Sequence, residues 1–234
     1  MSTAVSFFVS FYIFKGILVC ILYIFYSKIY STQLLCHFLC HFYSRIAIIL
    51  MVIKMNLKQY IDFLCDLLAI DIPKVQIHQN NKYMDIDGNI CNHFTLKKTS
   101  IATAYPTENL ICIDMDRANN DLIYAIIAHE LRHIYQYQAV QNPSWKEELS
   151  SVWELEFATY EDSSHDDYEN QSIEIDAWAF AKLIFNFIFR KDFTVHCNRN
   201  ALDIRLQELT IDFPRDDIID SYEFCIGEFN NYDA

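Results

Sequence analysis

The sequence lacks the features that would assign it to several common classes. It contains no run of clustered Lys and Arg, only the pairs Lys97-Lys98 and Arg190-Lys191. Phosphate contacts need such clusters, so we expect no nucleic-acid partner. Its eight cysteines are scattered and form no Cys-x-x-Cys pair, which favours small buried thiols in a reducing compartment over a disulfide framework.

Acidic residues are also missing from the first 54 positions, which carry only four Lys and Arg. From Met55 onward the chain has 14 Lys and Arg against 31 Asp and Glu, a net charge of −17. This contrast predicts two parts: a hydrophobic segment over residues 1–54, and a well-hydrated domain over residues 55–234.

The hydrophobic segment has two interpretations. Residues 4–26 are long and apolar enough to cross a bilayer once as a helix, although Lys15 lies near their middle. Residues 33–53 are a weaker candidate, because two His and one Arg interrupt them. Alternatively, translation starts at Met55, and the preceding segment is not part of the protein. The first interpretation anchors the protein in a membrane and the second leaves it in the cytoplasm, and the sequence leaves both open.

The acidic part shows both strand and helix patterns. Strands are predicted over residues 75–79, 100–106 and 110–116, with shorter strand pieces around Asp87-Gly88. Helices are predicted over residues 55–70, 121–140, 144–162, 173–189 and 200–209, followed by an acidic, loosely patterned end. These elements predict an α+β domain with a small antiparallel or mixed sheet.

The run His-Glu-Leu-Arg-His at residues 129–133 carries the clearest chemical signal. Residues four apart on a helix project from the same face, so His129 and His133 can point both imidazoles at one Zn²⁺ ion. Glu130 is rotated by one position, which places its carboxylate beside the metal, where it can accept a proton from the attacking water. The helix predicted over residues 121–140 is the one that this motif requires.

A catalytic zinc site needs a third protein ligand and leaves its fourth position to water. The extended metzincin pattern is excluded, because Gln136 and Ala139 replace its Gly and His. The acidic and histidine candidates further along the chain are His165, Asp166, Asp167, Glu174 and Asp176. Of these, Glu174 opens an otherwise apolar helix with alanines on its own face. That helix can pack closely against the helix predicted over residues 121–140 and bring the carboxylate to the metal. The metal would then be the partner of the buried charge.

AHELRH, followed some forty residues later by EIDAWAFA, resembles the ImmA/IrrE-type group of gluzincin metallopeptidases, which pair HExxH with a later E-x-x-A-x-x-F-A helix. The resemblance implies that His129, His133 and Glu174 hold the zinc and that Glu130 is the general base. It also implies that the strands ahead of the HExxH helix supply an edge strand for substrate.

The resemblance covers about residues 75–190 and has departures. The group often has a Gly before the second histidine, where this chain has Arg132, and an Asn where this chain has Trp178. No helix-turn-helix domain accompanies the predicted peptidase. We therefore do not extend the group's association with cleaving transcriptional repressors to this chain.

Taken together, we expect a zincin-like α+β domain over residues 55–234 that hydrolyses peptide bonds of a protein or peptide substrate with zinc and Glu130. The alternative is a non-catalytic zinc-binding or membrane-associated accessory protein, which predicts a fourth protein ligand. Two smaller suggestions concern the surroundings of the metal. Asp176 accepts a hydrogen bond from a ligand histidine or faces solvent, and Tyr160 or Tyr168 stabilises an oxyanion. The sequence does not indicate an oligomeric state.

Overall fold

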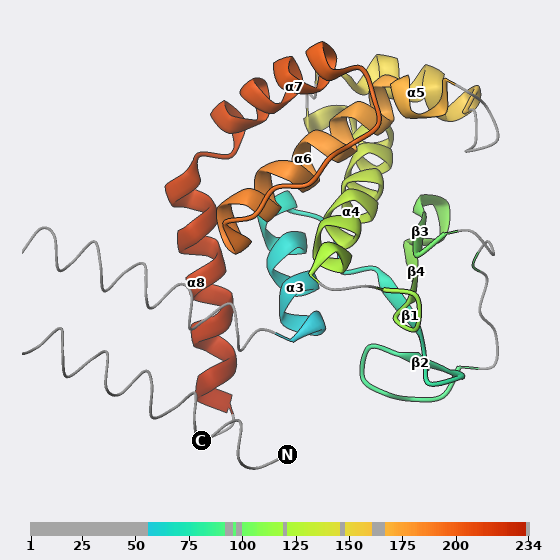
Figure 1. Cartoon of the computed structure of the whole chain (residues 1–234), viewed down its shortest axis with the longest axis vertical. Coiled ribbons are helices and arrows are strands. Elements are labelled where there is room, and N and C mark those ends of the chain that lie inside the picture. The colour runs from blue at the N-terminus through green and yellow to red at the C-terminus, as the bar shows by residue number, and fades with distance from the viewer. Residues whose placement is uncertain are drawn as a thin grey trace, which may run out of the picture. The chain divides into compact units, whose positions relative to one another are not determined.

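A computed structural model describes residues 56–232, except 92–95, 97–99, 119–120, 146–147 and 161–166. This part of the chain is α+β, with six helices and one four-stranded sheet (Figure 1). Within these ranges, no helix combines the length and apolar character that a membrane span requires. The expectations for residues 1–54, including the candidate span at 4–26, lie outside the described residues.

The sheet is mixed. It contains β1 (Lys74–Gln79), β2 (Lys82–Asp85), β3 (Ala102–Tyr105) and β4 (Leu110–Asp114), in the order β2-β1-β4-β3. The central strands β1 and β4 are parallel, and the two outer pairs are antiparallel. Asn80 and Asn81 join β1 to β2, both at positive φ (54° and 58°), as a two-residue type I′ hairpin requires. The strands predicted over residues 75–79, 100–106 and 110–116 are confirmed to within a few residues at their ends. Of the pieces predicted around Asp87-Gly88, the one before it is β2, and the described residues after it form only an isolated bridge at Ile90.

Strand β4 forms the interior of the sheet, and all five of its residues are buried. Strand β3 lies at the edge and packs against helix α4 (Leu122–Gln141). One edge of the sheet therefore lies along the helix that carries residues 129–133.

Helices α4 and α6 (Ser172–Phe189) pack side by side (Figure 1). They confirm the helices predicted over residues 121–140 and 173–189. Ala177 and Ala181 of α6 are completely buried, as their predicted packing role requires. This pairing brings together two segments that lie some forty residues apart in the sequence.

The N-terminus of α6 is capped from another helix. No side chain within α6 caps it, but Glu156 of α5 (Ser150–Ala158) accepts hydrogen bonds from the backbone N–H groups of Ser172 (2.9 Å) and Ile173 (2.7 Å). Helix α5 is shorter than the helix predicted over residues 144–162, and a 3₁₀ turn, η2 (Pro143–Trp145), precedes it. Through the two hydrogen bonds of Glu156, helix α5 fixes the first turn of α6.

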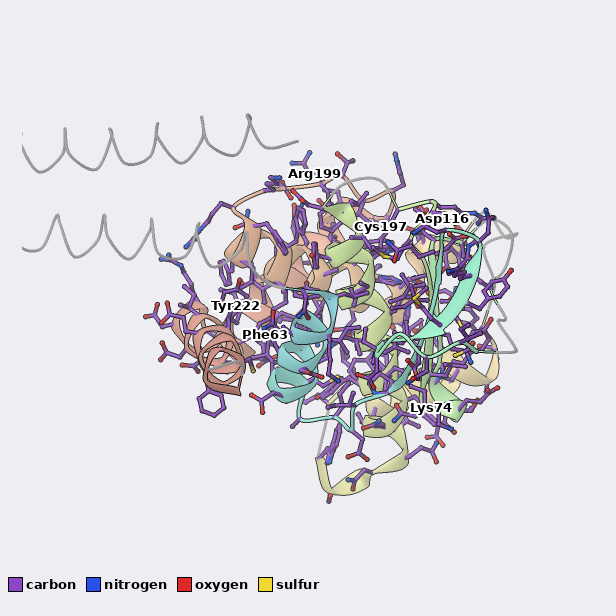
Figure 2. The ribbon with its side chains drawn as sticks, turned by 90° about the horizontal axis from the view of Figure 1, so that it is seen from below. Phe63, Lys74, Asp116, Cys197, Arg199 and Tyr222 are labelled. Carbon is purple, nitrogen blue, oxygen red and sulfur yellow. The ribbon has the colours of Figure 1, made fainter. Side chains whose placement is uncertain are left out.

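Of the remaining helices, α3 packs against α4, and α7 and α8 pack against α6. Asn56 caps α3 (Leu57–Leu68) through a capping box with Gln59. Phe63 of α3 packs edge-on against Tyr222 of α8 (Arg215–Tyr232), with ring centroids 5.4 Å apart (Figure 2). Helix α7 (Arg199–Asp212) lies against α6. None of the five cysteines in the described ranges forms a disulfide; Cys65, Cys112 and Cys225 are buried as expected, whereas Cys91 and Cys197 are partly exposed.

Candidate metal centre

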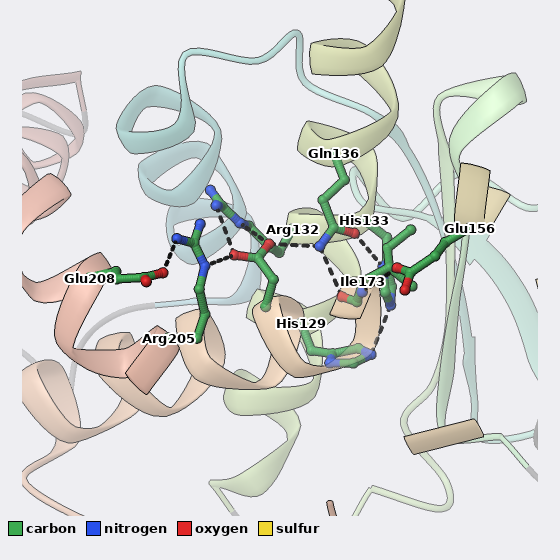
Figure 3. Close-up of polar contacts among 9 residues, drawn as sticks. His129, Arg132, His133, Gln136, Glu156, Ile173, Arg205 and Glu208 are labelled. Carbon is green, nitrogen blue, oxygen red and sulfur yellow. Dashed lines mark hydrogen bonds and ion pairs between the residues drawn. The ribbon is translucent and has the colours of Figure 1, made fainter. Parts of the chain in front are cut away.

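The three predicted ligands meet between α4 and α6. His129 and His133 lie one turn apart on α4, and Glu174 lies in the first turn of α6. The two histidine Nε2 atoms are 3.0 Å apart (Figure 3). The Glu174 carboxylate faces both rings, with Oε2 3.3 Å from His129 Nε2 and Oε1 3.4 Å from His133 Nε2. One ligand atom from each residue therefore converges on a single point.

The burial of this group fits a bound cation. Glu174 has no exposed surface, and its Oε2 lacks a hydrogen-bond partner within the described part of the chain. A buried carboxylate oxygen without a donor is costly unless a positive charge lies against it. Burial alone would raise the pKa of Glu174, but the neighbouring His133 and His129 outweigh it and lower the pKa to about 2. The carboxylate is therefore charged, and the group can hold a metal ion.

Glu130 lies next to this group without belonging to it. Its Oε2 accepts a hydrogen bond of 2.6 Å from the backbone N–H of Ala104 in β3. The surrounding protein buries the carboxyl group and raises its pKa to about 7, although His133 and the Ala104 N–H act in the opposite direction. The sequence predicted Glu130 beside a metal, and the structure places it next to the His-His-Glu group.

Tyr160 donates a hydrogen bond from its hydroxyl to Glu174 Oε1 at 2.5 Å. Burial and the neighbouring Glu174 raise the pKa of Tyr160, so its hydroxyl keeps its proton. Tyr168 packs edge-on against it, with ring centroids 5.9 Å apart. With fifteen tyrosines in the chain, no local sequence pattern distinguished these two from the others.

Asp176 differs from both sequence-based suggestions. It is 1% exposed, so it does not face solvent, and its hydrogen bonds go to Arg132, Gln136 and Arg205 and not to a histidine. Instead, Gln136 Oε1 lies 2.8 Å from His133 Nδ1, and Gln136 Nε2 donates to Asp176 Oδ2 at 2.7 Å. Arg132 forms a two-pronged ion pair with Asp176, at 2.8 and 3.1 Å. The amide of Gln136 thus occupies the position that the sequence suggested for Asp176.

The other histidine of the group, His129, is held differently. The ring of His129 packs on Trp178 of α6, with centroids 4.0 Å apart, and its buried Nδ1 has no hydrogen-bond partner among the described residues. Trp178 in turn contacts Phe193. The Trp at this position, where the resembled group usually has Asn, therefore supports His129 by ring packing.

Of the other candidate ligands, Asp167 and Asp176 are described and do not belong to the group. His165 and Asp166 lie outside the described residues, and Asp167 is exposed. A second cluster joins His78, Asp114 and Asp116, with His78 Nδ1 3.1 Å from Asp114 Oδ1. Its carboxylates already accept several backbone hydrogen bonds, and Arg117 pairs with Asp114 at 3.2 Å. Protein donors therefore already satisfy much of the hydrogen-bonding capacity of these two carboxylates.

No model of a protein family, no curated protein and no solved structure matches this chain. The resemblance to the ImmA/IrrE-type group therefore stays a prediction that rests on residues 129–133 and 174–181. The geometry by itself supports a narrower statement. It provides a buried His-His-Glu group able to hold a metal ion, with a carboxyl group of raised pKa beside it.

Proposed function

We propose that this protein is a zinc-dependent peptidase in which His129, His133 and Glu174 hold the metal and Glu130 is the general base. Two imidazoles and one carboxylate are a donor set typical of catalytic zinc. The observation that carries the proposal is the position of Glu130, a partly buried carboxyl group next to the ligands that the Ala104 N–H holds in place and whose pKa is raised to about 7. A hydrolytic site needs such a base at neutral pH, whereas a structural zinc site has no use for it.

The side chains divide the chemistry among them. Zinc bound to the three ligands would polarise the peptide carbonyl and acidify the attacking water. Glu130 accepts the proton of that water and then delivers it to the leaving amine. The Ala104 N–H holds Oε2 of Glu130, which fixes the carboxyl group and leaves Oε1 for the proton. Tyr160 keeps its proton and is the candidate donor to the developing oxyanion, for which its single O–H would turn away from Glu174 Oε1.

The edge strand β3 supports a peptide as substrate. The main chain at Ala104 contacts Glu130 directly, so the outer edge of β3 runs past the proposed base. An extended peptide can add to such an edge through main-chain hydrogen bonds. A peptide bound in this way would lie alongside the metal group.

Replacing Glu130 with Gln tests the mechanism, because the amide keeps the shape of the side chain and an acceptor for the Ala104 N–H but cannot take the proton. We expect cleavage of a mixed peptide library, followed by mass spectrometry, to fall by about 100-fold or more. The zinc content of the variant should remain that of the wild type. Glu154→Gln, at an exposed position on α5, is the control and should keep full activity.

Full activity in Glu130→Gln would contradict the assignment of the base. A wild-type protein that holds zinc but cleaves no member of the library would instead favour the non-catalytic alternative.

A further inference from the structure

Asp176 is the centre of a buried polar network beside His129, His133 and Glu174, which we call the metal group. Its Oδ1 accepts hydrogen bonds from Arg132 Nη2 and Arg205 Nε, at 3.1 and 2.7 Å. Its Oδ2 accepts from Arg132 Nε and Gln136 Nε2, at 2.8 and 2.7 Å. Four donors saturate the lone pairs of this carboxylate, which explains how a charged group is tolerated at 1% exposure.

This network determines how Gln136 meets His133. The amide nitrogen of Gln136 donates both of its hydrogens, to Asp176 Oδ2 and to the backbone carbonyl of Ile173 at 2.9 Å. Both partners are acceptors only, so the amide cannot be turned over without losing two hydrogen bonds. Its oxygen must therefore face His133, and His133 must donate from Nδ1. That arrangement leaves the lone pair of Nε2 directed at the metal.

The same network reaches the surface through one helix. Arg205 comes from α7, which lies against α6 and buries only Leu202 and Leu209. Its guanidinium also bonds Glu208 Oε2 at 2.8 Å, so Arg205 is oriented from its own helix (Figure 3). The chain of contacts runs from Glu208 through Arg205, Asp176 and Gln136 to His133.

We propose that helix α7 positions the metal ligand His133. Arg205 and Arg132 together hold Asp176, Asp176 holds the amide of Gln136, and that amide sets the orientation and tautomer of His133. Arg205, Asp176 and Gln136 are positioning residues, since none of them belongs to the metal group. The proposal rests on the metal site of the proposed function and adds that a peripheral helix tunes it.

The test is metal binding by the full chain, with Arg205→Met compared to Arg199→Met. Arg199 lies on the same helix but is 90% exposed at its side chain, and among the described residues it pairs with Asp203 alone, at 3.8 Å. Zinc affinity is measured by competition with a chromophoric chelator, and Co²⁺ absorption reports the geometry of the ligands. Loss of an outer partner of a metal-bound histidine typically weakens affinity about 10–100-fold. We expect roughly a 10-fold loss and an altered Co²⁺ spectrum in Arg205→Met, and neither change in Arg199→Met.

A double-mutant cycle with Gln136→Leu separates positioning from general destabilisation. If Arg205 acts through Gln136, the double variant should bind zinc about as weakly as Gln136→Leu alone. Independent effects would multiply instead, and that result would overturn the proposal. Should Arg205→Met fail to fold, Arg205→Lys keeps the charge without the planar fork, and it must show the same non-additivity with Gln136→Leu.

The failure of this proposal is distinguishable from failure of the proposed function. If the wild type binds zinc and the Arg205 variant keeps the same zinc affinity and Co²⁺ spectrum, only the role of α7 is refuted and the metal site stands. A wild-type protein that binds neither zinc nor Co²⁺ refutes the metal site, and the inference with it.

Discussion

At the scale of single residues, two carboxyl groups in the same site have pKa values displaced in opposite directions. Burial raises the pKa of Glu130 to about 7, because the removal of water from its carboxylate outweighs the opposing effects of His133 and the Ala104 N–H. Burial also acts on Glu174, but two histidines lie against its oxygens and lower its pKa to about 2. Such a separation assigns different roles to chemically identical groups: Glu174 is a permanent anion, and Glu130 can exchange a proton near neutral pH.

The raised pKa of Glu130 predicts how the metal-free protein responds to pH. An unfolded Glu loses its proton near pH 4.5, whereas folded Glu130 keeps it until about pH 7. Between these values the folded state binds the extra proton, so the stability contributed by this group is present below pH 4.5 and is lost as the pH rises to 7. Glu130→Gln removes this loss. We expect its stability advantage over the wild type to grow by about 2 kcal/mol between pH 5 and pH 8.

Urea unfolding of the metal-free proteins at both pH values measures this difference. Glu108→Gln, at an exposed position before β4, is the matched control and should show no such growth. An advantage that stays constant with pH would mean that Glu130 is ionised in the folded protein at pH 5.

At the scale of elements, local signals in the sequence predicted what local structure determines. Helix α4 and its two histidines follow from spacing alone, and α6 follows from an apolar pattern with Glu174 at its start. Helix α8 was missed, although Ile218, Tyr222 and Cys225 form a buried stripe at helical spacing. Frequent acidic residues around that stripe obscured it. The strand order β2-β1-β4-β3 was not predictable, because pairing between distant strands leaves no local signature.

The surroundings of the metal group divide in the same way. Gln136 follows His133 by three residues on α4, so helical geometry could have paired their side chains. Arg205 lies on a different helix and reaches Asp176 only through the packing of α7 on α6. That contact depends on tertiary structure, and no pattern in the sequence reports it. The sequence thus predicted the members of the His-His-Glu group better than the side chains that orient them.

The cap of α6 gives a prediction at this scale. Glu156 of α5 accepts hydrogen bonds from two backbone N–H groups and from the Ser172 hydroxyl, at 2.8 Å. Glu156→Ala leaves those donors without a partner, and loss of a cap typically costs about 1–2 kcal/mol. We expect that loss of stability in thermal unfolding, and a weaker affinity for zinc because Glu174 lies in the uncapped turn. Glu154→Ala, two residues earlier and exposed, should change neither; equal effects in both variants would exclude a specific cap.

At the scale of the whole molecule, the metal group connects parts that are distant in sequence. Residues 129–133 belong to α4, which packs against β3, α3 and α5, whereas Glu174 belongs to α6, which packs against α7 and α8. A cation bound between α4 and α6 would therefore act as a cross-link of the fold, and its binding free energy would appear as folding stability.

Zinc should accordingly raise the unfolding temperature of the full chain after treatment with a chelator. A ligand at 1,000 times its dissociation constant stabilises by about 4 kcal/mol, which corresponds to roughly 10 °C for a domain of this size. Glu174→Ala should lose most of this rise, because it removes the ligand that joins α6 to α4. His196→Ala, at an exposed position, should keep it. A full rise in Glu174→Ala would place the zinc elsewhere, with the cluster of His78, Asp114 and Asp116 as the first position to examine.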